Sequence, residues 1–247
     1  MPAIRGKGAY SGGWPITYDA VTGEVTMYDG PIWFYDDFMG AGHTSIPTTV
    51  SAGSTWCAKL VKTGGNPQVG APVNAGVVQV ALDATSEKQD AVLYCYDQRC
   101  YSGANGLGYE TRLQIPVLPT SGTKCVFGMA AAWADGPDNI AAYLRFAVNG
   151  NGLILAESYD GTTRLSVSTG VTVQTTSEWH VLRLDASDPT SAKFFIDGNP
   201  VCATTTFPFA ATGLAAQMQP YASAYKASGT SVGTFQLDYV QITQNSR

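Results

Sequence analysis

The sequence predicts an all-β protein built as a sandwich of two antiparallel sheets. Many short runs alternate apolar and polar side chains, which is the two-residue period of a half-buried strand. Paired turn residues separate nearly all of these runs, as at Asn105-Gly106, Asn149-Gly150, Asp160-Gly161 and Asp197-Gly198. No helical pattern of useful length survives, because Gly136 and Pro137 interrupt the Ala-rich stretch 130–144.

The expected strands follow one another from residue 33 onward. The run 108–115 shows the period most clearly, with Tyr109 and Leu113 on one face and Glu110 and Arg112 on the other. One face of such a strand packs into a core and the other meets water. The remaining expected strands are 33–38, 55–61, 76–82, 91–96, 124–133, 141–148, 153–158, 163–167 and 234–243.

The stretch 179–201 predicts a hairpin of two alternating strands. His180, Leu182 and Leu184 share one face, and the same spacing returns after the polar turn 185–190 at the positions Ala192, Phe194 and Ile196. Asp197-Gly198 then supplies a tight-turn signal.

Residues 1–30 differ from the rest and predict an N-terminal arm with a small hairpin, followed by one domain over 31–247. The arm is rich in glycine and places large apolar side chains between the glycines. So short a segment cannot bury all of them alone, and aromatic residues dominate interface energies. We expect a partner-docking role for Ile4, Tyr10, Trp14 and Tyr18. The alternative is an extra strand folded back on its own sandwich.

Composition narrows the function. The net charge is -5 and no basic run exists, which argues against nucleic acid as a partner. No run approaches the roughly 20 apolar residues of a membrane span, and the N-terminus lacks the apolar core of a signal peptide, so we expect synthesis in the cytoplasm without secretion. Five cysteines without a CxxC pair predict reduced, mostly buried thiols. A Cys95–Cys100 bridge is the alternative.

Several motifs resemble concanavalin A-like lectin and glucanase jelly rolls. The Trp-His strand and Asp-Gly corner of 179–201 are similar to a hairpin of that family, as are YETRLQI, CVFGMA and the final FQLDYVQI to other strands. These motifs all lie within the stretch of expected strands, residues 33–243. The resemblance implies a concanavalin A-like jelly-roll β-sandwich.

Three further stretches look like jelly-roll proteins of tailed bacteriophage particles. They are YDDF at 35–38, the stretch 82–94 and ADGPDN at 134–139. This resemblance implies a non-enzymatic virion protein, made in the host cytoplasm and incorporated into the particle. The implied role is that of a capsid decoration or cement protein on the head exterior, a homo-oligomer whose partner is the major capsid protein or another virion protein.

The residues required for catalysis are not evident. Retaining glucanases of this fold carry Glu-x-Asp-x-x-Glu on one strand, because their mechanism needs two carboxyl groups roughly 5 to 5.5 Å apart. No two of the five glutamates in this chain lie within twenty residues of each other. A pair of aspartates from separate strands, and hence a glycan hydrolase, is the alternative. His43 and His180 are the only histidines, and neither is accompanied by a nucleophile motif. We therefore expect no enzyme and no cofactor.

The main alternative function is a carbohydrate-binding module of a phage fibre or tail, with a surface glycan as its partner. Trp133 could stack on a sugar ring beside Asp135, Asp138 and Asn139. The oxygens of that loop also suit calcium. The competing interpretations are a core tryptophan and ordinary turn residues, and we expect no metal site.

Overall fold

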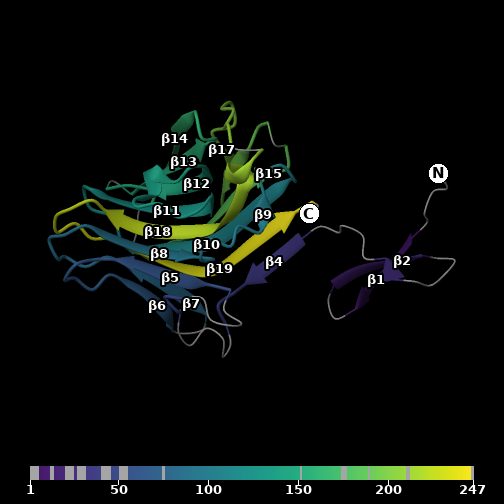
Figure 1. Ribbon diagram of the computed structural model, residues 1–247. Coiled ribbons are helices and arrows are strands. Elements are labelled where there is room, and N and C mark those ends of the chain that lie inside the picture. The colour runs from purple at the N-terminus through teal and green to yellow at the C-terminus, as the bar shows by residue number, and fades with distance from the viewer. Residues whose placement is uncertain are drawn as a thin grey trace.

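The computed structural model describes residues 6–11, 14–19, 25–26, 32–39, 46–49, 55–73, 76–150, 152–173, 177–188, 190–209 and 212–245. Within these ranges it contains strands and short 3-10 turns but no α-helix. Two eight-stranded antiparallel sheets lie face to face (Figure 1). The predicted all-β sandwich is therefore confirmed. No helix of the described residues is long and apolar enough to cross a membrane.

The first sheet is named here the β10 sheet after its longest central strand. Its neighbouring strands run in the order β17 (Asn199–Val201), β16 (Lys193–Ile196), β15 (Trp179–Ala186), β10 (Leu107–Val117), β19 (Thr234–Gln244), β7 (Val77–Ala81) and β6 (Gln68–Val73). One more strand, β4 (Ile32–Asp36), also pairs with β19.

The second sheet is named the β11 sheet. Its order is β14 (Arg164–Thr172), β13 (Leu153–Tyr159), β12 (Tyr143–Val148), β11 (Thr123–Ala130), β18 (Gln217–Lys226), β8 (Gln89–Tyr94) and β5 (Cys57–Val61). The short β9 (Tyr101–Ser102) pairs with the beginning of β18.

Aromatic side chains join the two sheets across the core. Phe127 of β11 meets Phe235 of β19 with ring centroids 4.6 Å apart, and Phe146 of β12 meets Phe194 of β16 at 5.0 Å. Both pairs are edge-to-face, the arrangement that the ring quadrupole favours. The inner faces of the two sheets thus form one continuous apolar core.

The expected hairpin is present as β15, β16 and β17. Leu182 pairs with Ile196 and Leu184 with Phe194, so the two predicted apolar faces coincide. Asp197 and Gly198 both have positive φ, 51° and 78°, as a type I′ turn requires.

The largest difference from the sequence prediction is β18, a ten-residue strand that the sequence analysis did not expect. It lies between β11 and β8 in the middle of its sheet. Its sequence, QMQPYASAYK, contains two Gln, two Ala, one Ser and one Pro, which are not strong strand formers. Pro220 falls between the part of β18 that pairs with β9 and the part that pairs with β8. β6 and β9 were also not expected.

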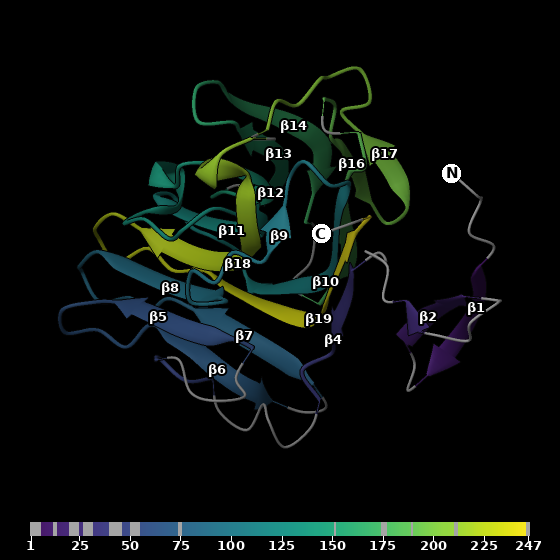
Figure 2. The same ribbon diagram turned by 45° about the vertical axis from the view of Figure 1, so that its right-hand side comes forward.

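The N-terminal strands form a separate small sheet. β1 (Gly6–Ser11) pairs with β2 (Trp14–Asp19), and β2 pairs with β3 (Val25–Thr26). In the described residues none of the three pairs with a strand of the sandwich. Figures 1 and 2 both draw this sheet to one side of the sandwich. The division into an arm over 1–30 and a domain over 31–247 stays a prediction.

Candidate functional site

The outer face of the β11 sheet carries an unusual set of charged side chains. Arg145 on β12 lies directly opposite Glu157 on β13, and both point away from the aromatic core. An outer sheet face normally meets water. Here, however, Arg145 is 1% exposed and Glu157 is 3% exposed. Something therefore covers this face.

The cover is the connection between β11 and β12, residues 131–142, which we name the 131–142 loop. Its short 3-10 turn, Pro137–Asn139, lies over Arg145, whose Nη1 donates a hydrogen bond of 2.6 Å to the Pro137 carbonyl. The backbone at Gly136 lies against the Tyr225 ring of β18. The loop therefore crosses several strands of the sheet.

Four charged groups fix the loop to the sheet. The Arg145 guanidinium binds Glu157 Oε2, with its Nε at 2.9 Å, and also contacts Asp138 of the loop. Lys124 Nζ on β11 lies 2.9 Å from Glu157 Oε1 and 2.8 Å from Asp138 Oδ1. Two cations and two carboxylates neutralise one another. Burial acts to raise the pKa of Asp138, but the hydrogen bond from Lys124 and the charges of Lys124 and Arg145 outweigh it, so the pKa is lowered.

Trp133 fixes the other end of the loop. Its indole Nε1 donates to Asp90 Oδ2 on β8 at 3.3 Å, and its backbone N–H donates to Asp97 Oδ1 at 2.7 Å. Lys59 Nζ on β5 lies 4.0 Å from the indole ring centroid. The loop is therefore held from β12 at one end to β5 at the other.

Asp90 is the most strongly perturbed carboxyl group of this face. It is fully buried, and burial raises its pKa to about 7, although the hydrogen bond from Trp133 opposes the shift. A buried carboxyl group without a basic partner favours its neutral form. Asp90 is thus protonated over part of the neutral range.

The structure brings together the four residues predicted for glycan binding, all in the 131–142 loop. Asp135 binds Lys88 Nζ at 2.6 Å, and Asn139 donates from Nδ2 to the Asp135 carbonyl at 2.6 Å. Asp138 and Trp133 hold the partners described above. All four are thus engaged with the protein itself. In the part of the chain that the structure describes, no three His, Cys, Asp or Glu side chains gather as a metal site would require.

The residues predicted for partner docking are only partly described. Tyr10 belongs to β1, opposite Pro15, while Trp14 and Tyr18 belong to β2, opposite Ser11 and Lys7. Ile4 lies outside the described residues. These backbone positions leave the docking role a prediction.

Of the two histidines, His180 lies within the β10 sheet. His180 is buried on β15, and its Nδ1 lies 2.7 Å from Asp197 Oδ2 in the hairpin corner. Asp197 Oδ1 also accepts the backbone N–H of Val181 at 2.8 Å. His180 is thus a hydrogen-bonded histidine within a sheet. His43 lies outside the described residues.

The cysteines carry no disulfide in the structure. Cys57 and Cys125 are buried, Cys95 and Cys202 are half-buried, and Cys100 is exposed. Burial raises the pKa of the Cys125 thiol to about 12, which keeps it protonated and unreactive.

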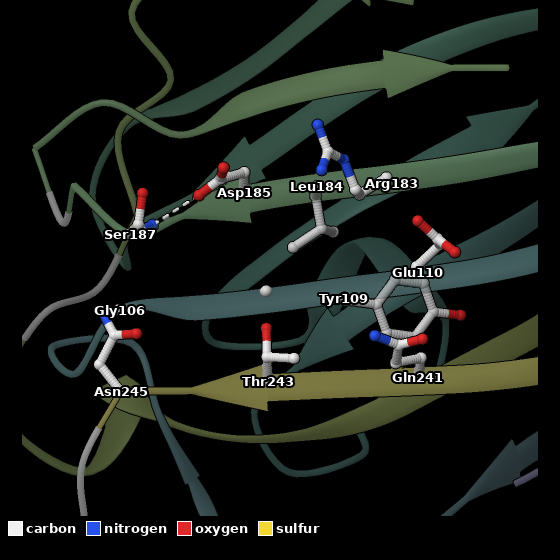
Figure 3. A pocket seen from close by; sticks show the side chains of 11 residues that line it. Gly106, Tyr109, Glu110, Arg183, Leu184, Asp185, Ser187, Gln241, Thr243 and Asn245 are labelled. Atoms are coloured by element: carbon white, nitrogen blue, oxygen red, sulfur yellow. Dashed lines mark hydrogen bonds between the residues drawn. The ribbon is translucent and has the colours of Figure 1, made fainter. Parts of the chain in front are cut away.

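A second, open site lies on the outer face of the β10 sheet, and the sequence analysis missed it. A hollow of about 310 Å³ opens above β15, β10 and β19 (Figure 3). Its floor is low because Gly108 has no side chain, and a Cβ there would lie 2.4 Å from Thr243 Oγ1. The polar side chains around it include Glu110, Arg183, Asp185, Ser187, Gln241 and Asn245. Only cross-strand register unites these residues, so no local motif reveals the site.

The fold and these two faces define a concanavalin A-like jelly roll whose outer β11 face is closed and whose outer β10 face is open. No known family model matches the chain, and no curated protein matches it. Solved structures with a similar fold do match the chain. An endo-1,3-beta-glucanase from Streptomyces sioyaensis superposes with a TM-score of 0.58 at 18% identity, over 90% of this chain and 99% of that one.

Two other solved structures are similar. A beta-glucanase from Bacillus licheniformis has a TM-score of 0.54 at 15% identity, over 87% of this chain and 98% of its own. The carbohydrate recognition domain of Emp47p has a TM-score of 0.51 at 12% identity, over 83% and 96%. At such identities these likenesses show the fold alone.

Proposed function

We propose that this chain is a non-enzymatic structural protein of a tailed-phage particle, a decoration or cement protein that docks on the head exterior in several copies. The observation that carries the non-enzymatic part is the closure of the outer β11 face by the 131–142 loop. Ligand and active sites are concave and open to their ligand. Here a cluster of four charged side chains fastens a loop over the face.

The chemistry of that cluster supports the same conclusion. A retaining glycosidase needs one carboxyl group as acid and one as nucleophile, both facing the substrate. Glu157 and Asp138 are the two carboxylates of this cluster, and each is bound by Arg145 and Lys124. A general acid also needs a pKa near the working pH, whereas the pKa of Asp138 is lowered. Asp138 is therefore not prepared to act as a general acid, and Asp90, whose pKa is raised to about 7, is buried and accepts a hydrogen bond from Trp133.

Two observations support the assignment to a phage particle. They are the sequence stretches 35–38, 82–94 and 134–139 and the N-terminal sheet. The last of these stretches lies in the 131–142 loop. The N-terminal sheet has only two strands longer than two residues. So small a sheet gains stability by packing on or pairing with another surface. A neighbouring subunit of a shell offers such a surface.

The experiment is a particle-incorporation assay. Phage particles are produced with the full chain, with a variant lacking residues 2–18, or with a variant in which 2–18 is scrambled at constant composition. Thermal melting of each purified chain tests its folding separately. We expect all three chains to melt alike and only the full chain to be retained on purified particles.

The scrambled variant is the matched control for length and composition. Retention of the truncated chain at full occupancy would overturn the docking role of residues 2–18. Absence of the full chain from particles would overturn the proposed function itself.

A further inference from the structure

Exposed apolar side chains gather on the segment 33–39, which comprises most of β4 and the turn that follows it. Five large hydrophobic side chains are exposed in the part of the chain that the structure describes, and three of them, Trp33, Tyr35 and Met39, lie in this segment. We name these three side chains the β4 surface. Outward strand positions are usually polar. Aromatic residues and methionine are instead enriched where proteins contact one another, so the composition of the β4 surface is that of an interface.

The side chains of the β4 surface are held in fixed positions. The rings of Trp33 and Tyr35 stack on each other, with centroids 6.0 Å apart, and Tyr35 stacks in turn on Tyr239 of β19 at 5.6 Å. The stacked rings form a ridge. After β4, Phe38 has a positive φ of 54° and lies in the core, which leaves Met39 outside with 60% exposure. Because these positions are set before any partner arrives, the entropic cost of association is lowered.

The backbone of β4 also forms an open edge of the β10 sheet. Within the described residues, β4 pairs with β19 alone, on one of its two sides. Such an edge can pair with a strand of another chain, and many proteins block it with lysine or proline. The sequence of β4, IWFYD, contains neither. The edge of β4 is therefore suited to accept a further strand.

The surroundings of the β4 surface are negatively charged. The pKa of Tyr35 is raised, first by burial and then by the charges of Asp37, Asp238 and Asp36, so three carboxylates lie near this ring. Arg112 neutralises one of them, because its Nη1 lies 2.8 Å from Asp238 Oδ2. Asp36 and Asp37 leave a negative excess at this end of β4, which would attract a positively charged partner.

The N-terminal segment of the chain has the opposite charge. Residues 1–18 contain Arg5 and Lys7 but neither Asp nor Glu. Lys7 belongs to β1, which has six residues against five for β4 and, in the described residues, pairs with β2 alone. The small sheet stands apart from the sandwich of its own chain (Figure 2). Each copy thus offers a basic edge strand and an acidic edge strand of similar length, and the two do not pair within one chain.

We propose that the β4 surface binds the N-terminal sheet of a second copy of this chain. Strand β1 of one copy adds to the open edge of β4 of another, which brings the positive charges of Arg5 and Lys7 toward Asp36 and Asp37. Strand addition supplies main-chain hydrogen bonds, and the β4 surface supplies the apolar contact. This inference rests on the docking role proposed for residues 2–18 and names the partner of that segment.

Sedimentation equilibrium of the full chain tests the surface. Trp33→Ser is the test variant, since an exposed side chain can be replaced without loss of the core. Val117→Ser is the matched control, because Val117 is 41% exposed but pairs with Thr234, whereas Trp33 pairs with Thr243, about 30 Å farther along β19. We expect the parent and the control to associate alike, and Trp33→Ser at least about tenfold more weakly. Added salt should weaken the parent, since it screens the charges. Thermal melting confirms that each variant is folded.

Cross-linking tests which segments meet and whether they belong to different copies. Isotopically heavy and light chains are mixed in equal amounts and treated with a carbodiimide, which joins a lysine amine to a neighbouring carboxylate. Mass spectrometry then identifies the joined peptides. We expect the peptide that contains Lys7 to be joined to the peptide that contains Asp36 and Asp37, in pairs of one heavy and one light peptide as well as in pairs of like label.

Three results would overturn the proposal. The first is a parent that stays monomeric at millimolar concentration. The second is a Trp33→Ser variant that associates as strongly as the parent. The third is a cross-link of Lys7 that occurs only between peptides of like label, which would assign the β4 surface to the N-terminal sheet of the same chain. If the parent were monomeric and residues 2–18 were still needed for retention on phage particles, the docking role would stand and its partner would be another virion protein.

Discussion

At the scale of single residues, Asp90 links the closed β11 face to pH. Burial raises its pKa to about 7 from an ordinary value of 3.8. The folded protein therefore holds a proton that the unfolded chain releases at lower pH. The contribution of Asp90 to stability is complete below about pH 4 and is lost as the pH rises through about 7. Between these two pH values the free energy of unfolding falls by roughly 4 kcal/mol at most through Asp90.

Asp90→Asn removes this dependence, because the amide stays neutral at every pH. We expect the variant to gain stability relative to the parent as the pH rises from 5 to 8, by roughly 2 to 3 kcal/mol. Urea unfolding at several pH values measures the difference.

Asp83→Asn serves as the control for Asp90→Asn. The pKa of Asp83 is lowered, chiefly by the backbone N–H of Asn66, so Asp83 is ionised in both states above pH 5. The free energy of unfolding of Asp83→Asn should therefore differ from that of the parent by a constant amount between pH 5 and 8. If the free energy of unfolding of Asp90→Asn also differed from that of the parent by a constant amount over this pH range, the raised pKa of Asp90 would be contradicted.

At the scale of elements, the 131–142 loop is fastened mainly through Arg145. Its guanidinium binds Glu157, Asp138 and the Pro137 carbonyl, and it lies 3.6 Å from the Tyr143 ring centroid. Removing one partner of a buried ion pair leaves the other charge poorly compensated. Closure of the face thus depends on one side chain.

Arg145→Met should lower the free energy of unfolding by about 3 to 5 kcal/mol, since Glu157 keeps only Lys124 as a cation. The double variant Arg145→Met with Glu157→Leu should recover much of that loss, because a buried pair replaced by apolar side chains is often close to neutral. Denaturant unfolding of the single and double variants measures both effects.

The control is Arg112→Met in the half-exposed pair with Asp238, with an expected loss below about 1 kcal/mol. Equal losses for Arg145→Met and Arg112→Met would show that the buried pair does not hold the loop.

Elements differ in how far the sequence could predict them. The β15–β16–β17 segment was predictable because the period of its strands and the Asp197-Gly198 turn between β16 and β17 are local signals. β18 was not, since its Ala, Ser and Pro residues form a strand only between β11 and β8. The 131–142 loop was predicted not to be helical, but its partners Lys59 and Asp90 lie far from it along the chain, so its covering role could not be inferred.

At the scale of the whole molecule, the protein is a rigid sandwich with one closed and one open outer face and a small sheet of its own at the N-terminus. Figure 2 shows this small sheet standing apart from the sandwich. Close packing of the two sheets and a charged cluster that fastens a loop suit a body that acts through its surfaces. The central claim is therefore that the chain binds to a particle and does not turn over glycans.

Electron cryomicroscopy of purified phage particles tests this claim most directly. We predict density for the sandwich on the outer surface of the head, in copies that follow the symmetry of the shell. The same purified chain should release no reducing sugar from a soluble 1,3-β-glucan. Particles without this density, together with turnover of the glucan that Glu157→Gln abolishes, would contradict the account and assign the chain to the hydrolases.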